Sequence, residues 1–162
     1  MRVTKIIVTG IVAMLLIACA AHASATKIKK TELPEPVREA VDRMAPGGHV
    51  VACWRNVGDS AGVYEVDMKV NGRKKGMVVA TDGEVLTVQD EITWNDLPEA
   101  VQQSFRREAR DHDVEEVDLL TQHGEVVGYI ARIDGEEREY QFRVGPDGEP
   151  LDSEKERHSR EP

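Results

Sequence analysis

Cysteine is scarce in this sequence. Among 162 residues there are only two, Cys19 and Cys53, and Cys19 lies in an apolar stretch near the N-terminus. If that stretch is removed, Cys53 is the only cysteine of the mature chain, and no internal disulfide can form. The core must then be stabilised by packing alone. Because Cys53 lies in the strand-like run VVACW, we expect a buried, unreactive thiol.

Motifs that carry catalytic chemistry are also scarce. The sequence has no H-E-x-x-H or C-x-x-C pattern, no phosphate-binding loop and no dinucleotide-binding glycine pattern. The histidines after residue 26 are scattered over unlike segments, at His49, His112, His123 and His158. Asp111–Asp113 (Asp-His-Asp) offers too few ligands to hold a metal ion by itself. We therefore expect no enzyme activity, no cofactor and no metal site; a hydrolase would have to use Cys53 or a histidine.

Long apolar runs are absent after residue 26, so nothing there is long enough to cross a membrane. At the N-terminus, Arg2 and Lys5 supply positive charge before the apolar run IIVTGIVAMLLIACAA. Small residues at Ala21–Ala23 and Ala23–Ala25 then have the spacing that signal peptidase recognises. We therefore expect residues 1–25 to be a signal peptide and the mature protein to be exported, to the periplasm or as a secreted protein.

A second interpretation of the N-terminus remains open. Leu16–Cys19 (Leu-Ile-Ala-Cys) resembles a bacterial lipobox, in which Cys19 would become the acylated first residue. The protein would then be an outer-membrane lipoprotein, and the lipid at Cys19 would be its membrane contact. An uncleaved N-terminal anchor is a third alternative.

Positive charge is in deficit. The chain has 30 Asp and Glu against 21 Lys and Arg, a formal charge of −9, and loss of Arg2 and Lys5 with the signal peptide would lower it to −11. Such a surface repels phosphate backbones and anionic lipids, so we expect no nucleic-acid partner. Solubility alone accounts for this charge, and a specific basic partner is the alternative.

The chain does contain an internal repeat. Leu33-Pro34 and Leu97-Pro98 each open a helical pattern, with proline where the first helical turn accepts it. The residues that follow at helical spacing are Val37, Ala40, Val41 and Met44 in the first copy, and Ala100, Val101, Ser104, Phe105 and Ala109 in the second. Each set predicts an amphipathic helix with one apolar face.

After each helix the apolar period changes to two, which indicates strands. The alternating residues are Tyr64, Val66, Met68 and Val70 in the first copy, and Tyr129, Ala131 and Ile133 in the second. Ala52 and Trp54 align with Val117 and Leu119 in the strand that comes before. Asp82-Gly83 and Asp147-Gly148, 65 positions apart, turn the last hairpin of each copy.

These patterns predict an α+β fold, with two repeats of one helix followed by a four-stranded antiparallel sheet and with the helices on one sheet face. We expect a flexible segment at 26–31, repeats at 32–89 and 97–151, a linker at 90–96 and a disordered tail at 152–162. So small a repeat has a marginal core, so the two should join into one sheet or pack closely. Trp94 should plug their junction rather than bind a ligand.

The ordered motifs resemble those of PepSY-like proteins, which are related in fold to the β-lactamase inhibitor protein. The first copy has Leu33–Val37 (LPEPV), Tyr64–Val66 (YEV) and Asp82–Leu86 (DGEVL). The second has Leu97–Val101 (LPEAV), Tyr129–Ala131 (YIA) and Asp147–Leu151 (DGEPL). The second copy departs at Ile130, which replaces an acidic residue, and at Pro150, whose missing N–H should make the last strand an edge or very short. The resemblance covers residues 32–151.

The resemblance implies an exported, non-catalytic module that binds another extracytoplasmic protein, in some relatives as an inhibitor of peptidases or of β-lactamase. It also implies a sheet with helices on one face and the other face free for a partner, but it transfers no binding residue. A periplasmic small-ligand or metal-ion sensor or carrier is the alternative function.

Strand alternation predicts which side chains lie on the free face. Charges of both signs there could steer a protein partner, and an ordinary solvated sheet face is the alternative. The candidate partner-facing residues are Glu65, Asp67, Lys69, Arg132, Glu139 and Arg143.

Overall fold

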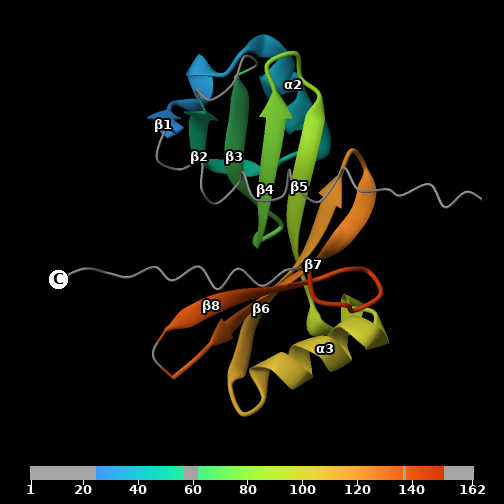
Figure 1. The fold of residues 1–162 in the computed structure, drawn as a ribbon. Helices are drawn as coiled ribbons and strands as arrows, with labels where there is room; N and C mark the ends of the chain where they lie inside the picture. Colours follow the sequence, from blue (N-terminus) through green and yellow to red (C-terminus); the bar gives the residue numbers. More distant parts are fainter. Residues whose placement is uncertain (1–24, 57–61, 137, 152–162) are drawn as a thin grey trace, which may run out of the picture.

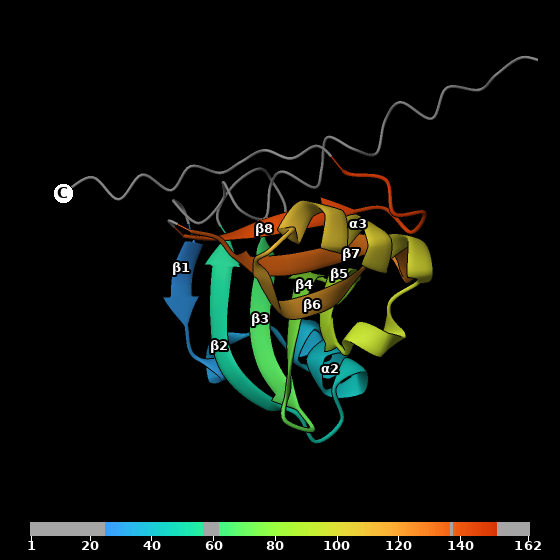
Figure 2. The same ribbon diagram turned by 90° about the horizontal axis from the view of Figure 1, so that it is seen from below.

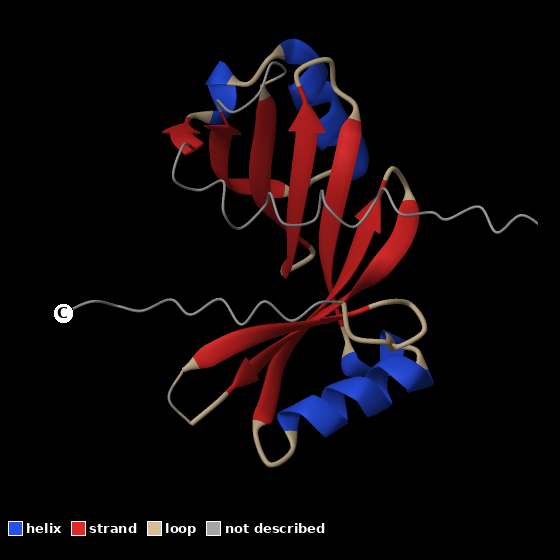
Figure 3. Cartoon of the chain, in the orientation of Figure 1, coloured by secondary structure: helices blue, strands red, loops and turns tan. Residues whose placement is uncertain are grey.

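The computed structural model describes residues 25–56, 62–136 and 138–151. In these ranges the chain is α+β, with two helices that are each followed by strands of one eight-stranded antiparallel sheet. The strand order is that of the sequence, from β1 to β8, so each strand pairs with its neighbours in the chain (Figures 1 and 3). Residues 1–24 of the predicted signal peptide, with Cys19, and the predicted tail at 152–162 lie outside the described residues.

The two halves of the sheet contain different numbers of strands. The first half consists of β1 (Ala25–Ile28), the 3-10 helix η3 (Lys30–Glu32), α2 (Glu35–Met44), β2 (His49–Asn56), β3 (Val63–Val70), β4 (Arg73–Ala80) and β5 (Val85–Ile92). The second half consists of the 3-10 helix η4 (Trp94–Asp96), α3 (Glu99–Ala109), β6 (Asp113–Gln122), β7 (Glu125–Asp134) and β8 (Glu139–Val144). No described helix is long and apolar enough for a membrane crossing.

The fourth strand predicted for the second copy is reduced to one bridge. Val144 pairs with Pro150, and the Leu151 N–H donates to the Arg143 carbonyl oxygen at 3.0 Å. Pro150 has no N–H to continue the ladder, which confirms that this strand is very short.

Both helices pack on the same face of the sheet, over two separate cores. The first core contains Leu33, Val37, Ala40, Val41, Cys53, Tyr64, Val66, Met68, Met77, Val79 and Val88. The second contains Leu97, Val101, Phe105, Ala109, Val117, Tyr129, Ala131, Ile133, Phe142 and Val144. The predicted alternation of β3 and β7 is confirmed. Tyr64, Val66 and Met68 of β3 are buried in the first core, and Tyr129, Ala131 and Ile133 of β7 are buried in the second. Figures 1 and 2 show β6–β8 crossing the direction of β2–β5 at a wide angle, with the helices outside this bend.

Corresponding hydrogen bonds hold the start of α2 in the first half and the start of α3 in the second. An acidic residue caps the preceding 3-10 helix: Glu32 accepts from the Lys29 N–H at 2.7 Å, and Asp96 from the Thr93 N–H at 2.9 Å. One helical turn later, the side chains of Arg38 and Gln102 donate to the carbonyl oxygens of Leu33 and Leu97 at 2.9 and 3.0 Å. A β-bulge also falls at corresponding places, between Val50 and Ala52 in β2 and between Val114 and Glu116 in β6.

The repeated Asp-Gly turns support the first turn of each helix. A Cβ on Gly83 would lie 2.7 Å from the Pro36 carbonyl oxygen, and one on Gly148 would lie 2.6 Å from that of Ala100. Both glycines also have positive φ, +90° and +81°. Only glycine avoids both the clash and the backbone strain. The recurrence of the Asp-Gly turn in the two halves therefore has a physical reason.

Two segments expected to lack regular structure lie partly in the sheet. In the segment expected to be flexible, at 26–31, the residues up to Ile28 pair with β2, and Ile28 packs against the first core. The expected linker at 90–96 begins inside β5, since Asp90–Ile92 pair with β6. Asp90 in this segment forms an ion pair with Lys75 of β4, at 2.6 Å. Trp94 packs on the second core, with its ring centroid 6.5 Å from that of Phe105.

The Cys53 thiol should react very slowly with iodoacetamide at neutral pH. Cys53 is 2% exposed, and burial raises the pKa of its thiol above the ordinary value of a cysteine. Both effects suppress the thiolate that reacts. We expect labelling at least about 100-fold slower than for free cysteine, measured by mass spectrometry, and full labelling in urea. Native labelling as fast as that of free cysteine would show a reactive site.

Candidate functional site

No described helix covers the sheet face opposite α2 and α3, which we call the helix-free face. Cross-strand partners share a face, and Glu65, on β3 between buried Tyr64 and Val66, pairs with Trp54 and Val78. All six predicted partner-facing residues lie on the helix-free face: Glu65, Asp67 and Lys69 on β3, Arg132 on β7, and Glu139 and Arg143 on β8. The bend of the sheet turns this face inward (Figure 2).

A row of cross-strand neighbours joins the two halves across the helix-free face. Lys69 lies opposite Lys74, and the Lys74 N–H donates to the Glu91 carboxylate at 2.8 Å. The row continues from Glu91 to Asp118, then to Ile130 and to Arg143. It therefore has an exposed lysine on β3 and a half-buried arginine on β8 at its two ends.

Glu116 is the centre of a charge network beside this row. Its carboxylate accepts from Lys74 Nζ and from Arg132 Nη1 and Nη2, at 3.3 and 3.2 Å for the arginine. Arg132 Nε also forms an ion pair with Glu139 at 2.9 Å. Lys74 belongs to the first half and Arg132 to the second, so Glu116 ties the halves together. Its side chain is only 13% exposed, so solvent screens these pairs less than ordinary surface pairs.

Asp118 is a buried acid in the same region. It is 4% exposed, and Gln89 Nε2 donates to its Oδ2 at 3.0 Å. Burial raises the pKa of Asp118, and the neighbouring carboxylates of Glu116 and Glu91 act in the same direction. The Gln89 hydrogen bond and the Arg132 charge oppose this rise. Folding therefore favours the protonated form of Asp118.

Asp118→Asn should stabilise the protein at pH 7 and lose that advantage in acid. An acid whose pKa is raised by folding contributes stability at low pH, and this is lost as pH rises from the unfolded pKa through the folded one. The amide removes the buried charge, so we expect a gain on the order of 1 kcal/mol at pH 7 and none near pH 3, from urea unfolding. Exposed Asp111→Asn is the control. A loss of stability at pH 7 in Asp118→Asn would contradict the account.

The alignment of Trp54 with Leu119 in the sequence is out of register by one residue, because Cys53 and Val117 hold the corresponding core positions. The structure places Trp54 on the helix-free face, half-buried, while Cys53 takes the core position. Both strands have a bulge at corresponding places, so the residue of β6 that corresponds to Trp54 is Asp118, on the helix-free face, and not Leu119. Lys27 Nζ lies 5.9 Å from the Trp54 ring centroid, in a cation–π arrangement.

The hollow beside Trp94 is small for a small-molecule site. A hollow of about 140 Å³ is lined by the end of β5, Trp94 and the start of β6. Small-molecule sites usually measure about 300–1,000 Å³. In residues 25–56, 62–136 and 138–151, no group of three or more His, Cys, Asp and Glu side chains is placed to hold a metal ion.

Sequence reasoning also missed a motif between β2 and β3. Residues 58–62 read Gly-Asp-Ser-Ala-Gly, which has the G-x-S-x-G spacing of a nucleophile elbow. Residues 57–61 lie outside the described residues. The flanking strands are antiparallel neighbours, whereas a nucleophile elbow leads from a strand into a helix. The spacing therefore lacks the context of a serine nucleophile.

Comparison with known proteins yields structural matches only. No protein-family model matches the sequence, and no curated protein matches it significantly. A candidate periplasmic protein from Bacteroides eggerthii has a TM-score of 0.59 at 22% identity, covering 74% of this chain and 86% of that one. A DUF2874 family protein from Bacteroides uniformis has a TM-score of 0.58 at 20% identity, with the same coverage.

A third solved structure bears on the predicted resemblance. A BLIP-like protein from Bacteroides fragilis matches with a TM-score of 0.52 at 18% identity, covering 74% of this chain and 84% of that one. At such identities the similarity concerns the fold alone. The chain therefore shares the α+β fold of these Bacteroides DUF2874 and BLIP-like structures.

Proposed function

We propose that this chain is an exported, non-catalytic module that binds another extracytoplasmic protein through the helix-free face. The observation that carries the proposal is the asymmetry of the sheet. Two helices bury one face, whereas no described helix covers the other, which holds half-buried Trp54, Arg132 and Arg143. Tryptophan and arginine are among the residue types most enriched at the energetic centres of protein interfaces.

The fold neighbours support the same proposal. One is a candidate periplasmic protein and another is BLIP-like, which agrees with export and with an inhibitor-like role. We propose inhibition or modulation of an enzyme such as a peptidase as the mode of action. Export would use the signal peptide at 1–25, with lipid attachment at Cys19 as the alternative route.

We further propose that residues 32–89 and 97–151 are tandem PepSY-like copies. The matching helix caps, the bulges in β2 and β6, and the contacts of Gly83 and Gly148 support a duplication. Duplication also accounts for the two cores, since each copy buries its own helix while sharing one sheet with the other.

Affinity capture tests the proposed function. The mature chain is immobilised and exposed to periplasmic extract, beside a Trp54→Ala variant and a Glu39→Ala control on the exposed side of α2. We expect a retained protein whose affinity falls about tenfold or more with Trp54→Ala and is unchanged with Glu39→Ala. No retained protein at micromolar bait, or equal retention by all three chains, would contradict the proposal.

The alternative function, a small-ligand or metal-ion sensor or carrier, gains no support from the hollow beside Trp94 because that hollow is small. It requires calcium, zinc or copper to raise the melting temperature at near-stoichiometric concentration.

A further inference from the structure

Several carboxylates of the helix-free face are already engaged. Glu116 and Glu139 are bound by Lys74 and Arg132, and Glu91 accepts from the Lys74 N–H. Asp118 is buried and bonded to Gln89. Glu65 and Asp67 also have interactions of their own. These acids therefore leave little acceptor capacity for cations that lie elsewhere on the face.

Three bases on the same face retain free donors. The Lys69 ammonium is exposed and has no hydrogen bond or ion pair with any residue that the structure describes. The Arg143 guanidinium is half-buried, and its one side-chain hydrogen bond within the described ranges is a 3.5 Å contact with Gln141. Lys27 lies over the Trp54 ring and has no carboxylate partner in the described part of the chain.

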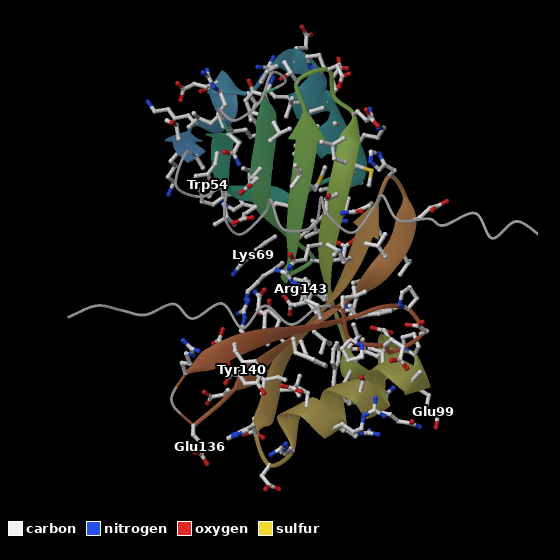
Figure 4. All side chains as sticks on the ribbon, viewed as in Figure 1. Trp54, Lys69, Glu99, Glu136, Tyr140 and Arg143 are labelled. Carbon is white, nitrogen blue, oxygen red and sulfur yellow. The ribbon has the colours of Figure 1, made fainter. Side chains whose placement is uncertain are left out.

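Lys69 and Arg143 lie in different halves of the bent sheet, on the same face. Lys69 and Arg143 mark the two ends of the row that crosses from β3 to β8, one in each half. Figure 4 shows both side chains projecting into the region between the halves. Trp54 lies on the same face of β2, the strand next to that of Lys69, with an aromatic surface half open to a partner.

We infer that the helix-free face binds an acidic segment of its protein partner, with Asp or Glu side chains held by Lys69 and Arg143 and the adjoining chain packed on Trp54. This inference rests on the proposed function and names the chemistry of the partner. The formal charge of −9 favours basic partners at long range, whereas the free bases on this face favour an acidic one. Arginine and lysine with unused donors give charge-assisted hydrogen bonds to carboxylates at short range, so this face would select its partner locally.

Peptide binding tests the inference directly. The probes are fluorescein-labelled hexaglutamate and hexaglutamine peptides, titrated with the mature chain at low ionic strength and followed by fluorescence anisotropy. We expect saturable binding of hexaglutamate, at least about tenfold tighter than that of hexaglutamine. Equal affinity for the two peptides, or no saturable binding of hexaglutamate, would overturn the inference.

Two variants with the same change in net charge locate the binding. Lys69→Glu/Arg143→Glu should weaken hexaglutamate binding at least about tenfold, whereas Lys29→Glu/Arg43→Glu, at exposed sites off the helix-free face, should change it less than about twofold. Equal losses in both would mean a long-range charge effect and would contradict the inference. The milder Lys69→Gln/Arg143→Gln serves if the reversal variant fails to fold.

Residues 152–162 contain lysine and arginine, so this tail could itself bind an acidic peptide. A truncated chain that ends at Leu151 separates binding by the tail from binding by the helix-free face. Binding retained by this chain supports the inference, and binding lost on truncation overturns it. If a captured partner needs Trp54 but tolerates Lys69→Glu/Arg143→Glu, the proposed function stands and the acidic-segment inference fails.

Discussion

Gly148→Ala should lower the free energy of unfolding by about 3 kcal/mol, because two costs combine at this position. The added Cβ would lie 2.6 Å from the Ala100 carbonyl oxygen and 2.7 Å from its carbonyl carbon, so helix α3 would have to move from the turn. The φ of +81° is also unfavourable for alanine. Urea unfolding followed by circular dichroism measures the loss.

A matched substitution separates the two costs. Gly124 has nearly the same φ, +82°, but a Cβ added there would have no heavy atom within 4 Å. Gly124→Ala should therefore lose only the backbone contribution, about 1 kcal/mol. If both variants lost the same stability, the contact between the Asp-Gly turn and the helix would have no energetic role. Gly83→Ala, against Pro36, should behave like Gly148→Ala.

Phe105→Ala should be among the most damaging core substitutions, with an expected loss of about 4 kcal/mol. Phe105 is fully buried in α3, and its ring packs against two other aromatic residues of the second core. Its ring centroid lies 6.5 Å from that of Trp94 and 6.2 Å from that of Phe142, the latter in an edge-on arrangement. Removing the ring leaves a cavity between the helix and the sheet.

The corresponding helix position of the first half provides the control. Val41 on α2 is 2% exposed and matches Phe105 in its distance from the preceding Leu-Pro pair. Val41→Ala removes fewer buried atoms, so we expect a loss of about 2 kcal/mol in the same unfolding experiment. A larger loss for Val41→Ala than for Phe105→Ala would contradict the account, in which the Phe105 ring contributes more buried surface to its core than the Val41 side chain does.

Much of the fold could be predicted because its signals are local. The helical spacing of Val37, Ala40 and Val41 and the alternation of Tyr64, Val66 and Met68 each report which side chains are buried. The six partner-facing residues followed from this alternation, and all lie on the helix-free face. Their role in binding stays a prediction.

The features that were missed depend on contacts between distant residues. The alignment of Trp54 with Leu119 was off by one residue, because the pairing that makes Trp54 correspond to Asp118 joins distant parts of the chain. β1 has only one large apolar residue, Ile28, and exists because it pairs with the open edge of β2. The turn at His123-Gly124, both with positive φ, lacks the Asn or Asp that usually signals a tight hairpin.

The charge network could not be derived from the sequence for the same reason. The Glu116 carboxylate accepts hydrogen bonds from Lys74, 42 positions earlier in the chain, and from Arg132, 16 positions later. Glu116 and Asp118 alternate with Val117 and Leu119, so their face was predictable. Their partners depend on the pairing of β5 with β6, which fixes where the two halves meet.

Site-specific photo-crosslinking in intact cells of the natural host tests the central claim most directly. A photoreactive amino acid replaces Gln141, exposed on the helix-free face, or Glu39, exposed on α2. We predict a covalent adduct with another extracytoplasmic protein from position 141 and none from position 39. An adduct from position 39 alone, or no adduct from position 141, would contradict the claim that the helix-free face binds a protein partner.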